Sequence, residues 1–129
     1  MNRSRLRIAV VDDDESVRKA LKRLLRAANL DADTFASGRE FLDSLPAQVP
    51  DCIVLDLHMP GMNGLDIQRQ LARGALRVPI VVITGHDEPQ TRAQCLSAGA
   101  AAYLRKPLDD EALLDAIHRA AGVARSSTA

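Results

Sequence analysis

The sequence predicts an α/β protein built on a doubly wound, five-stranded parallel sheet with helices on both faces. A continuous apolar run from Cys52 to Leu55 leads into the single carboxylate Asp56, as is typical of a strand buried on both faces of a parallel sheet. Strand-like and helix-like segments also alternate five times along the 129 residues, without an internal repeat. Because crossovers between parallel strands are right-handed, five strands favour the flavodoxin-like order 2-1-3-4-5.

The amino-terminal half supplies the first three strands and two helices. The strands are expected over residues 6–11, 31–35 and 52–56. One apolar stripe at helical spacing predicts the first helix and consists of Val17, Leu21, Leu24, Leu25 and Ala28. Asp14 is expected to cap that helix, and Ser37 opens an S-x-x-E capping box for a helix that runs to about Leu45. Pro46 and Pro50 bracket the loop into the central strand.

The carboxyl-terminal half repeats the pattern. Met59-Pro60-Gly61 ends the central strand, and Asn63 can cap a third helix that ends near Gly74. Strands are then expected over 79–84 and 101–104, with a helix over 88–98 between them and a last helix from about residue 109 to Gly122. We therefore expect one domain over residues 1–122, followed by a flexible tail or the start of a linker over 123–129.

Composition excludes several kinds of partner. Lys and Arg together number 17, as do Asp and Glu, so the formal net charge is zero and gives no sign of nucleic-acid or membrane binding. The sequence shows no signal peptide and no apolar run of membrane-spanning length. Cys52 and Cys95 are expected to be free and buried, as in a reducing compartment. These features predict a cytoplasmic protein.

Chemistry-bearing residues follow four of the predicted strands. Because the carboxyl ends of parallel strands meet at one edge, that edge should collect Asp12 and Asp13, Asp56, Thr84 and Lys106. Clustered carboxylates repel one another unless a cation lies between them, and an all-oxygen set with open positions suits Mg²⁺. A hydroxyl and an ammonium are the donors that receive the remaining oxygens of a phosphoryl group. The edge is therefore a candidate Mg²⁺-dependent phosphoryl site.

The sequence resembles the receiver domain of two-component response regulators over nearly its whole length. The matching motifs stand in family order at their usual spacing and are Val11-Asp12-Asp13, Asp56 with Met59-Pro60-Gly61, Thr84-Gly85 and Lys106-Pro107. Thr84-Gly85-His86 further resembles the FixJ-type branch, whose full-length members append a helix-turn-helix DNA-binding domain. The resemblance implies a CheY-like fold, and a chain that is either a stand-alone receiver or one half of a larger regulator.

The resemblance also implies roles for the site residues. Asp56 would accept a phosphoryl group from the phosphohistidine of a sensor histidine kinase. Asp13 and Asp56 would bind Mg²⁺, or Mn²⁺ in its place, directly, together with the backbone carbonyl of His58, and Asp12 would act through water. Thr84 and Lys106 would contact phosphoryl oxygens, and the Lys106-Pro107 peptide bond would be cis.

The resemblance further implies a conformational response. Tyr103 would be a switch aromatic that turns inward as Thr84 moves, the alternative being a plain half-buried strand residue. Phosphorylation would promote a homodimer through the fourth helix and fifth strand, where Arg92 and Gln94 are expected to be exposed. His58 and His86 lie two residues beyond Asp56 and Thr84, so their rings could obstruct or orient the water that removes the phosphoryl group. Both could instead simply point to solvent.

Two other functions fit part of the pattern. A haloacid-dehalogenase-type phosphatase also uses a strand-end Asp, Mg²⁺, a hydroxyl and a Lys, but it needs an acid two residues after the nucleophile, where this chain has His58. A pseudo-receiver would be a purely structural interaction domain, but such domains typically lack one of the acids. We therefore expect a phosphoacceptor switch rather than an enzyme that turns over a substrate. His118, on the last helix, is expected to be a solvated surface residue.

Overall fold

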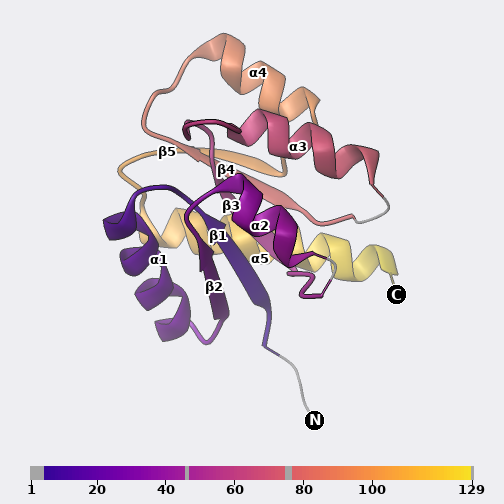
Figure 1. Cartoon of the computed structure of the whole chain (residues 1–129). Coiled ribbons are helices and arrows are strands. Elements are labelled where there is room, and N and C mark those ends of the chain that lie inside the picture. The colour runs from indigo at the N-terminus through magenta and orange to yellow at the C-terminus, as the bar shows by residue number, and fades with distance from the viewer. Residues whose placement is uncertain (1–4, 46, 75–76, 129) are drawn as a thin grey trace.

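The computed structural model describes residues 5–45, 47–74 and 77–128, and Pro46 lies outside them. Strands and helices alternate strictly along the chain (Figure 1). The strands are β1 (Arg7–Val11), β2 (Asp31–Phe35), β3 (Cys52–Asp56), β4 (Ile80–Thr84) and β5 (Ala102–Arg105). The helices are α1 (Glu15–Ala27), α2 (Gly38–Ser44), α3 (Gly64–Arg73), α4 (Pro89–Ser97) and α5 (Asp110–Thr128).

All five strands pair in parallel in the order β2-β1-β3-β4-β5, which confirms the predicted fold. The central strand β3 lies between β1 and β4, with Val54 opposite both Val10 and Val81. All five residues of β3 are buried, as a strand covered on both faces requires. The topology reverses direction between β1 and β3, which is where open α/β sheets place their ligands.

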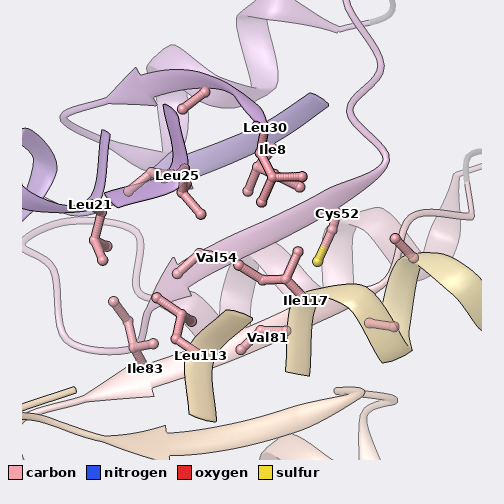
Figure 2. Packing of buried hydrophobic residues seen from close by; sticks show 14 residues of the cluster. Ile8, Leu21, Leu25, Leu30, Cys52, Val54, Val81, Ile83, Leu113 and Ile117 are labelled. Carbon is pink, nitrogen blue, oxygen red and sulfur yellow. The ribbon is translucent and has the colours of Figure 1, made fainter. Parts of the chain in front are cut away.

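Helices cover both faces of the sheet and enclose two separate cores. Figure 2 shows the core beneath α1 and α5, where Leu25 of α1 and Leu113 and Ile117 of α5 meet strand residues such as Val54. The second core lies beneath α2, α3 and α4, which contribute Phe41, Ile67 and Cys95 respectively. Alternate residues of each buried strand enter opposite cores, so both layers depend on the same strands.

Side-chain caps fix the beginning of four helices, since Asp109 also accepts a hydrogen bond from the Ala112 amide at the start of α5. Asp14 accepts a hydrogen bond from the Ser16 amide at the start of α1, and Ser37 accepts one from the Glu40 amide at the start of α2. The carboxylate of Glu40 accepts from the Ala36 amide instead of that of Ser37, so only half of the predicted capping box forms. A complete capping box joins Asn63 and Asp66 at the start of α3. By contrast, α4 begins at Pro89, and the side chain of the preceding Glu88 forms no cap hydrogen bond.

The last helix is longer than the sequence indicated. We expected it to stop around Gly122, but α5 continues to Thr128 and therefore includes most of the expected tail, while residue 129 lies outside the description. An isolated glycine in a helix costs only about 1 kcal/mol relative to alanine, so it does not by itself end a helix. The domain boundary at residue 122 stays a prediction.

The remaining general expectations concern the cysteines and the membrane. Cys52 and Cys95 are both free and buried, as predicted, and burial raises the pKa of the Cys52 thiol to about 12. None of the helices in the described ranges is long and apolar enough to cross a membrane.

Candidate functional site

The predicted site residues end four neighbouring strands of one sheet. Asp12 follows β1, Asp56 is the last residue of β3, Thr84 is the last residue of β4, and Lys106 follows β5. Because every strand runs in the same direction, all four positions lie at the carboxyl edge of the sheet.

Three carboxylates gather at this edge. Asp12, Asp13 and Asp56 each offer an oxygen, and these three oxygens lie within 4.8 Å of one another. Asp12 is fully buried and Asp56 is 4% exposed, whereas Asp13 is exposed to solvent. The cluster is therefore a pocket with two buried walls and one open side, through which a ligand can enter.

Lys106 supplies the positive charge of the cluster. Its Nζ donates a hydrogen bond to Asp12 Oδ2 at 3.0 Å and lies 3.5 Å from Asp56 Oδ1. The Lys106-Pro107 peptide bond is cis, as the resemblance implied. One ammonium thus faces three carboxylates, and negative charge remains in excess.

The pKa values of Asp56 and Lys106 reflect both burial and this excess of negative charge. Burial raises the pKa of Asp56 to about 6, the negative charge of Asp12 adds to the rise, and Lys106 offsets part of it. Burial alone would lower the pKa of Lys106, but its hydrogen bond to Asp12 and the charges of Asp56 and Asp12 outweigh burial, so its pKa is raised. The lysine therefore stays charged at neutral pH, and the Asp56 carboxylate lacks sufficient compensation.

This donor set fits a hard divalent cation. Two or three carboxylate oxygens on one side, with an open side for water or an oxygen ligand, are typical of Mg²⁺ sites. Burial and, after it, the charge of Asp12 raise the pKa of Asp56, so a cation at this position would favour the charged carboxylate.

Three backbone contacts hold the acids and were not evident from the sequence. The Asp14 amide donates to Asp12 Oδ1 at 2.9 Å, and Arg18 Nη1 donates to the Asp12 carbonyl oxygen at 2.8 Å. Gly64 lets the start of α3 approach β3, since a Cβ there would lie 2.8 Å from the Asp56 carbonyl oxygen. A glycine just after a predicted cap was the only sequence signal of this close approach.

Thr84 is fully buried, but its hydroxyl is engaged within its own loop. Thr84 Oγ1 accepts from the His86 amide at 3.0 Å and donates to the His86 carbonyl oxygen at 3.2 Å. The side chain therefore stands at the predicted position with its hydrogen-bonding capacity used by the loop after β4.

Tyr103, in β5, is buried beside α4. Its hydroxyl has no hydrogen-bond partner among the described residues, while the Arg92 guanidinium lies 5.8 Å from its ring centroid. Burial raises the pKa of Tyr103, and the nearby Asp87 carboxylate raises it further. Asp87 is itself 3.8 Å from Arg105. An aromatic ring with an unsatisfied hydroxyl thus lies between β5 and the start of α4.

The two histidines beyond the strand ends meet across the site. The rings of His58 and His86 are exposed and stand edge to face, with their centroids 5.8 Å apart. Of the other candidates, Asp14 caps α1 as expected, and His118 is exposed on α5 with Nδ1 2.9 Å from the Leu114 carbonyl oxygen.

Comparison with known proteins identifies the family. The protein-family model described as "Response regulator receiver domain" matches residues 8–118 of the chain. The chain is 42% identical to Nodulation protein W of Bradyrhizobium diazoefficiens over 110 residues, which are 85% of this chain and 48% of that protein. It is 38% identical to Response regulator protein TodT of Pseudomonas putida over 113 residues, or 88% of this chain and 50% of that protein. The chain thus spans about half the length of these relatives.

Solved structures agree with the sequence comparison. A response regulator receiver protein from Burkholderia phymatum is 48% identical, with a TM-score of 0.81 over 92% of this chain and 96% of that one. The structure of FixJ-N is 32% identical, with a TM-score of 0.86 over 93% of this chain and 96% of that one. This similarity supports the FixJ-type assignment, and the family's function is a phosphoacceptor switch rather than the phosphatase considered above. With its acidic pocket at the carboxyl edge of a CheY-like sheet, the chain belongs to the response regulator receiver domain family of two-component systems.

Proposed function

We propose that Asp56 is the residue that accepts the phosphoryl group, from the phosphohistidine of a sensor histidine kinase. The observation that carries this assignment is the position of Asp56 at the end of the central strand, buried, 3.5 Å from Lys106 and grouped with Asp12 and Asp13. Asp13 is exposed, and both Asp12 oxygens face other partners, at the Asp14 amide and the Lys106 ammonium.

The transfer exchanges one bond to phosphorus for another. An oxygen of the Asp56 carboxylate attacks phosphorus, the bond between phosphorus and the donor imidazole nitrogen breaks, and that nitrogen keeps the electron pair and later takes a proton. Lys106 stands close enough to Asp56 to hold a phosphoryl oxygen once it arrives. The donor must approach from the open side of the pocket, where Asp13 is exposed.

Asp13, Asp56 and the His58 backbone carbonyl would hold Mg²⁺ or Mn²⁺ directly, with Asp12 acting through water. When bound, the cation would supply positive charge for the phosphoryl oxygens and for the crowded carboxylates. The indirect role of Asp12 is supported by its existing bonds, since its oxygens already accept from the Asp14 amide and from Lys106.

Thr84 and Tyr103 would convert phosphorylation into a change of surface. To donate to a phosphoryl oxygen, the Thr84 hydroxyl must leave the His86 carbonyl oxygen, which changes the loop between β4 and α4. Tyr103 packs beside α4 near Asp87 of that loop, and its hydroxyl has no hydrogen-bond partner among the residues that the structure describes, so a shift of the loop changes its surroundings at little cost in hydrogen bonds. His58 and His86 would tune the lifetime of the phosphoryl group by screening Asp56 from water.

The response would be a homodimer formed through α4 and β5. Arg92 and Gln94 are exposed on α4, and Leu96 on the same helix is 43% exposed, which is unusual for a large apolar side chain in this molecule. The relatives include transcriptional regulators, such as NtrC of Klebsiella pneumoniae, which is 40% identical over 81% of this chain and 22% of that protein. We place the protein in the cytoplasm, with residues 1–122 relaying the signal to a transcriptional output and residues 123–129 leading into a tail or linker.

Labelling with a small phosphoryl donor tests the assignment of Asp56. With Mg²⁺ and acetyl phosphate, the protein should take up one acid-labile phosphoryl group per chain. Asp56→Asn should take up none, because an amide is a poor nucleophile and lacks the charge for the cation. Asp14→Asn is the matched control and should label normally, since asparagine caps a helix as well as aspartate does. Stoichiometric label on Asp56→Asn would disprove the assignment.

Sedimentation tests the dimer separately. Beryllofluoride with Mg²⁺ mimics the phosphoryl group and should convert a monomer to a dimer in the wild type. Leu96→Glu, which places a charge in the α4 surface, should remain a monomer while still labelling at Asp56. A dimer that is unaffected by this charge would move the interface to another face of the molecule.

A further inference from the structure

The histidine pair above the acidic pocket has features of a second binding site. His58 lies in the loop after β3 and His86 in the loop after β4, and their ring centroids are 5.8 Å apart at an interplanar angle of 87°. His86 Nε2 also lies 3.8 Å from Glu88 Oε2, which is beyond hydrogen-bonding distance. Among the residues that the structure describes, neither imidazole takes part in a hydrogen bond, so the ring nitrogens of both are available.

We propose that His58, His86 and Glu88 form a site for one divalent transition-metal ion of the zinc class, separate from the all-oxygen site below it. Imidazole nitrogen is a preferred ligand of Zn²⁺, Cu²⁺ and Ni²⁺, whereas Mg²⁺ takes oxygen ligands. Two histidines with one carboxylate and an open position form a common three-ligand zinc set. The two neighbouring sites thus differ in ligand chemistry and should select different ions.

One ligand–ligand distance is already close to what such an ion needs, that between His86 and Glu88. Zinc bonds of about 2.0–2.2 Å at a tetrahedral angle place two ligand atoms about 3.3–3.5 Å apart. The 3.8 Å between His86 and Glu88 is therefore about half an ångström too long, and both side chains are well exposed, at 72% and 59%. Two imidazoles on one tetrahedral ion have centroids about 5 Å apart, by the same bond lengths. The ligand atoms of His58, His86 and Glu88 are not gathered within 4.8 Å of one another as those of the three acids are, so binding requires these exposed side chains to rotate together. Such rotation needs no movement of the sheet.

The third histidine of the chain is a natural internal control. His118 is exposed on α5, and its Nδ1 lies 2.9 Å from the Leu114 carbonyl oxygen. The Asp115 carboxylate one turn away pairs with Arg119 at 3.1 Å. His118 thus offers one free nitrogen and no second imidazole, so it should not bind an ion tightly.

A bound ion would also join the two loops that flank Asp56. Thr84 lies two residues before His86 and hydrogen-bonds its backbone, so fixing His86 keeps the Thr84 hydroxyl in its present position. This consequence rests on the proposed function, because it matters only if Asp56 is phosphorylated and Thr84 must move. The ion would then slow labelling of Asp56 and hinder the subsequent response.

Metal titration of the untagged full chain tests the site directly. In millimolar Mg²⁺, Zn²⁺ in competition with a chromophoric chelator should bind once per chain. His58→Ala and His86→Ala should each weaken Zn²⁺ binding by at least about 10-fold, because loss of even an outer-shell partner typically has an effect of this size. Glu88→Gln should weaken it less, and His118→Ala should change it by less than twofold. Both site histidines are exposed, so these variants should fold as the wild type does.

Three titration results would overturn the proposal. The first is that His58→Ala and His86→Ala both bind Zn²⁺ as tightly as the wild type. The second is that Asp13→Asn loses Zn²⁺ affinity as fully as the histidine variants do. The third is that excess Mg²⁺ abolishes Zn²⁺ binding. In proton NMR the ring signals of His58 and His86 should shift with Zn²⁺ while those of His118 stay in place, and a shift confined to His118 would be a fourth result that overturns the proposal.

Acetyl phosphate labelling in the presence of Zn²⁺ tests the metal site and the proposed phosphorylation of Asp56 separately. If Zn²⁺ binds as expected and slows acetyl phosphate labelling in the wild type but not in His86→Ala, both the site and its consequence stand. If Zn²⁺ binds but the labelling rate is unaffected, the consequence is wrong. If Zn²⁺ binds and no variant or condition gives labelling, the proposed function fails while the metal site stands.

Discussion

The two halves of the functional edge are held to different degrees. In the acid half, formed by Asp12, Asp13, Asp56 and Lys106, the buried oxygens are tied to the Asp14 amide and to the lysine, and α3 packs directly on the Asp56 backbone through Gly64. In the response half, formed by Thr84, Tyr103 and α4, the threonine hydroxyl bonds its own loop, and the tyrosine hydroxyl has no hydrogen-bond partner within the described part of the chain.

The helix termini repeat this contrast. The helices α1, α2, α3 and α5 begin with side-chain caps, whereas α4 has none. Beneath α4, Gln68 is buried and donates to the Cys95 carbonyl oxygen, but its own carbonyl oxygen is unsatisfied within the described residues. Unsatisfied buried groups and uncapped ends lower the cost of local rearrangement. This fold therefore holds the chemical groups firmly and leaves the adjoining surface free to respond.

The largest expected effects come from variants that separate metal binding and phosphorylation from the conformational response. Asp13→Asn should weaken Mg²⁺ binding by more than about 100-fold, because even outer-shell partners typically contribute 10–100-fold. Thr84→Ala should still accumulate phosphate but lose the beryllofluoride-induced dimer, and Thr84→Ser should retain both. Mg²⁺ titration, labelling and sedimentation measure these outcomes. If Thr84→Ala dimerised normally, the response half would lose its assigned role.

Two glycine-to-alanine substitutions, one in the acid half and one control, test how tightly the acid half is packed. Gly64→Ala would place a Cβ 2.8 Å from the Asp56 carbonyl oxygen and 2.9 Å from Leu57 Cα, both backbone atoms that cannot move freely. Overpacking of this kind should lower the free energy of unfolding by about 1–3 kcal/mol.

Gly122→Ala is the control, since a Cβ there meets nothing within 4 Å and lies in helix α5. It should raise the free energy of unfolding by about 0.5–1 kcal/mol. Urea unfolding with Mg²⁺ present measures both variants. Equal stability of the two would show that α3 does not lock the acid half.

The pKa of Asp56 predicts a pH effect in the metal-free protein. Its folded-state pKa of about 6 exceeds the ordinary value of 3.8, so the folded chain binds more protons between these pH values than the unfolded chain. Stability should therefore fall as pH rises through about 4 to 6 and then level off. The full shift corresponds to about 3 kcal/mol, which solvent at the pocket mouth reduces to about 1–2 kcal/mol.

Asp56→Asn isolates this effect. In EDTA at pH 7 the variant should be about 1–2 kcal/mol more stable than the wild type, and the difference should shrink towards pH 4. Millimolar Mg²⁺ should stabilise the wild type and not the variant. Urea unfolding at the two pH values gives the answer, and a wild type as stable as the variant at pH 7 would mean that Lys106 compensates the cluster fully.

The smallest effect concerns Tyr103. Because none of the described residues forms a hydrogen bond with its buried hydroxyl, Tyr103→Phe should be neutral or stabilising by up to about 1 kcal/mol in the unphosphorylated state. The ring stays beneath the Arg92 guanidinium in this variant. Unfolding experiments measure the change. A loss of more than about 1 kcal/mol would reveal a hydrogen bond of this hydroxyl in solution.

The sequence predicts the acid half better than the response half for a physical reason. Strand order and the meeting of Asp12, Asp56 and Lys106 follow from alternating elements and from parallel strand direction, which are global constraints. The unsatisfied hydroxyl of Tyr103 and the bond from Thr84 to its own loop depend on rotamers, which no residue pattern reports. Similarly, Gly122 predicts a helix end from its residue type, but the small intrinsic cost of a glycine does not stop α5, which continues to Thr128.

Hydrogen exchange with and without beryllofluoride tests the contrast between the halves most directly. In Mg²⁺, the mimic should alter amide protection across residues 84–105, which include the end of β4, α4 and β5. The strand amides of β1 and β3 should keep their protection, because their contacts are already complete before the ligand arrives. Changes in β1 and β3 as large as those in 84–105 would contradict the account of a rigid acid half beside a movable response half.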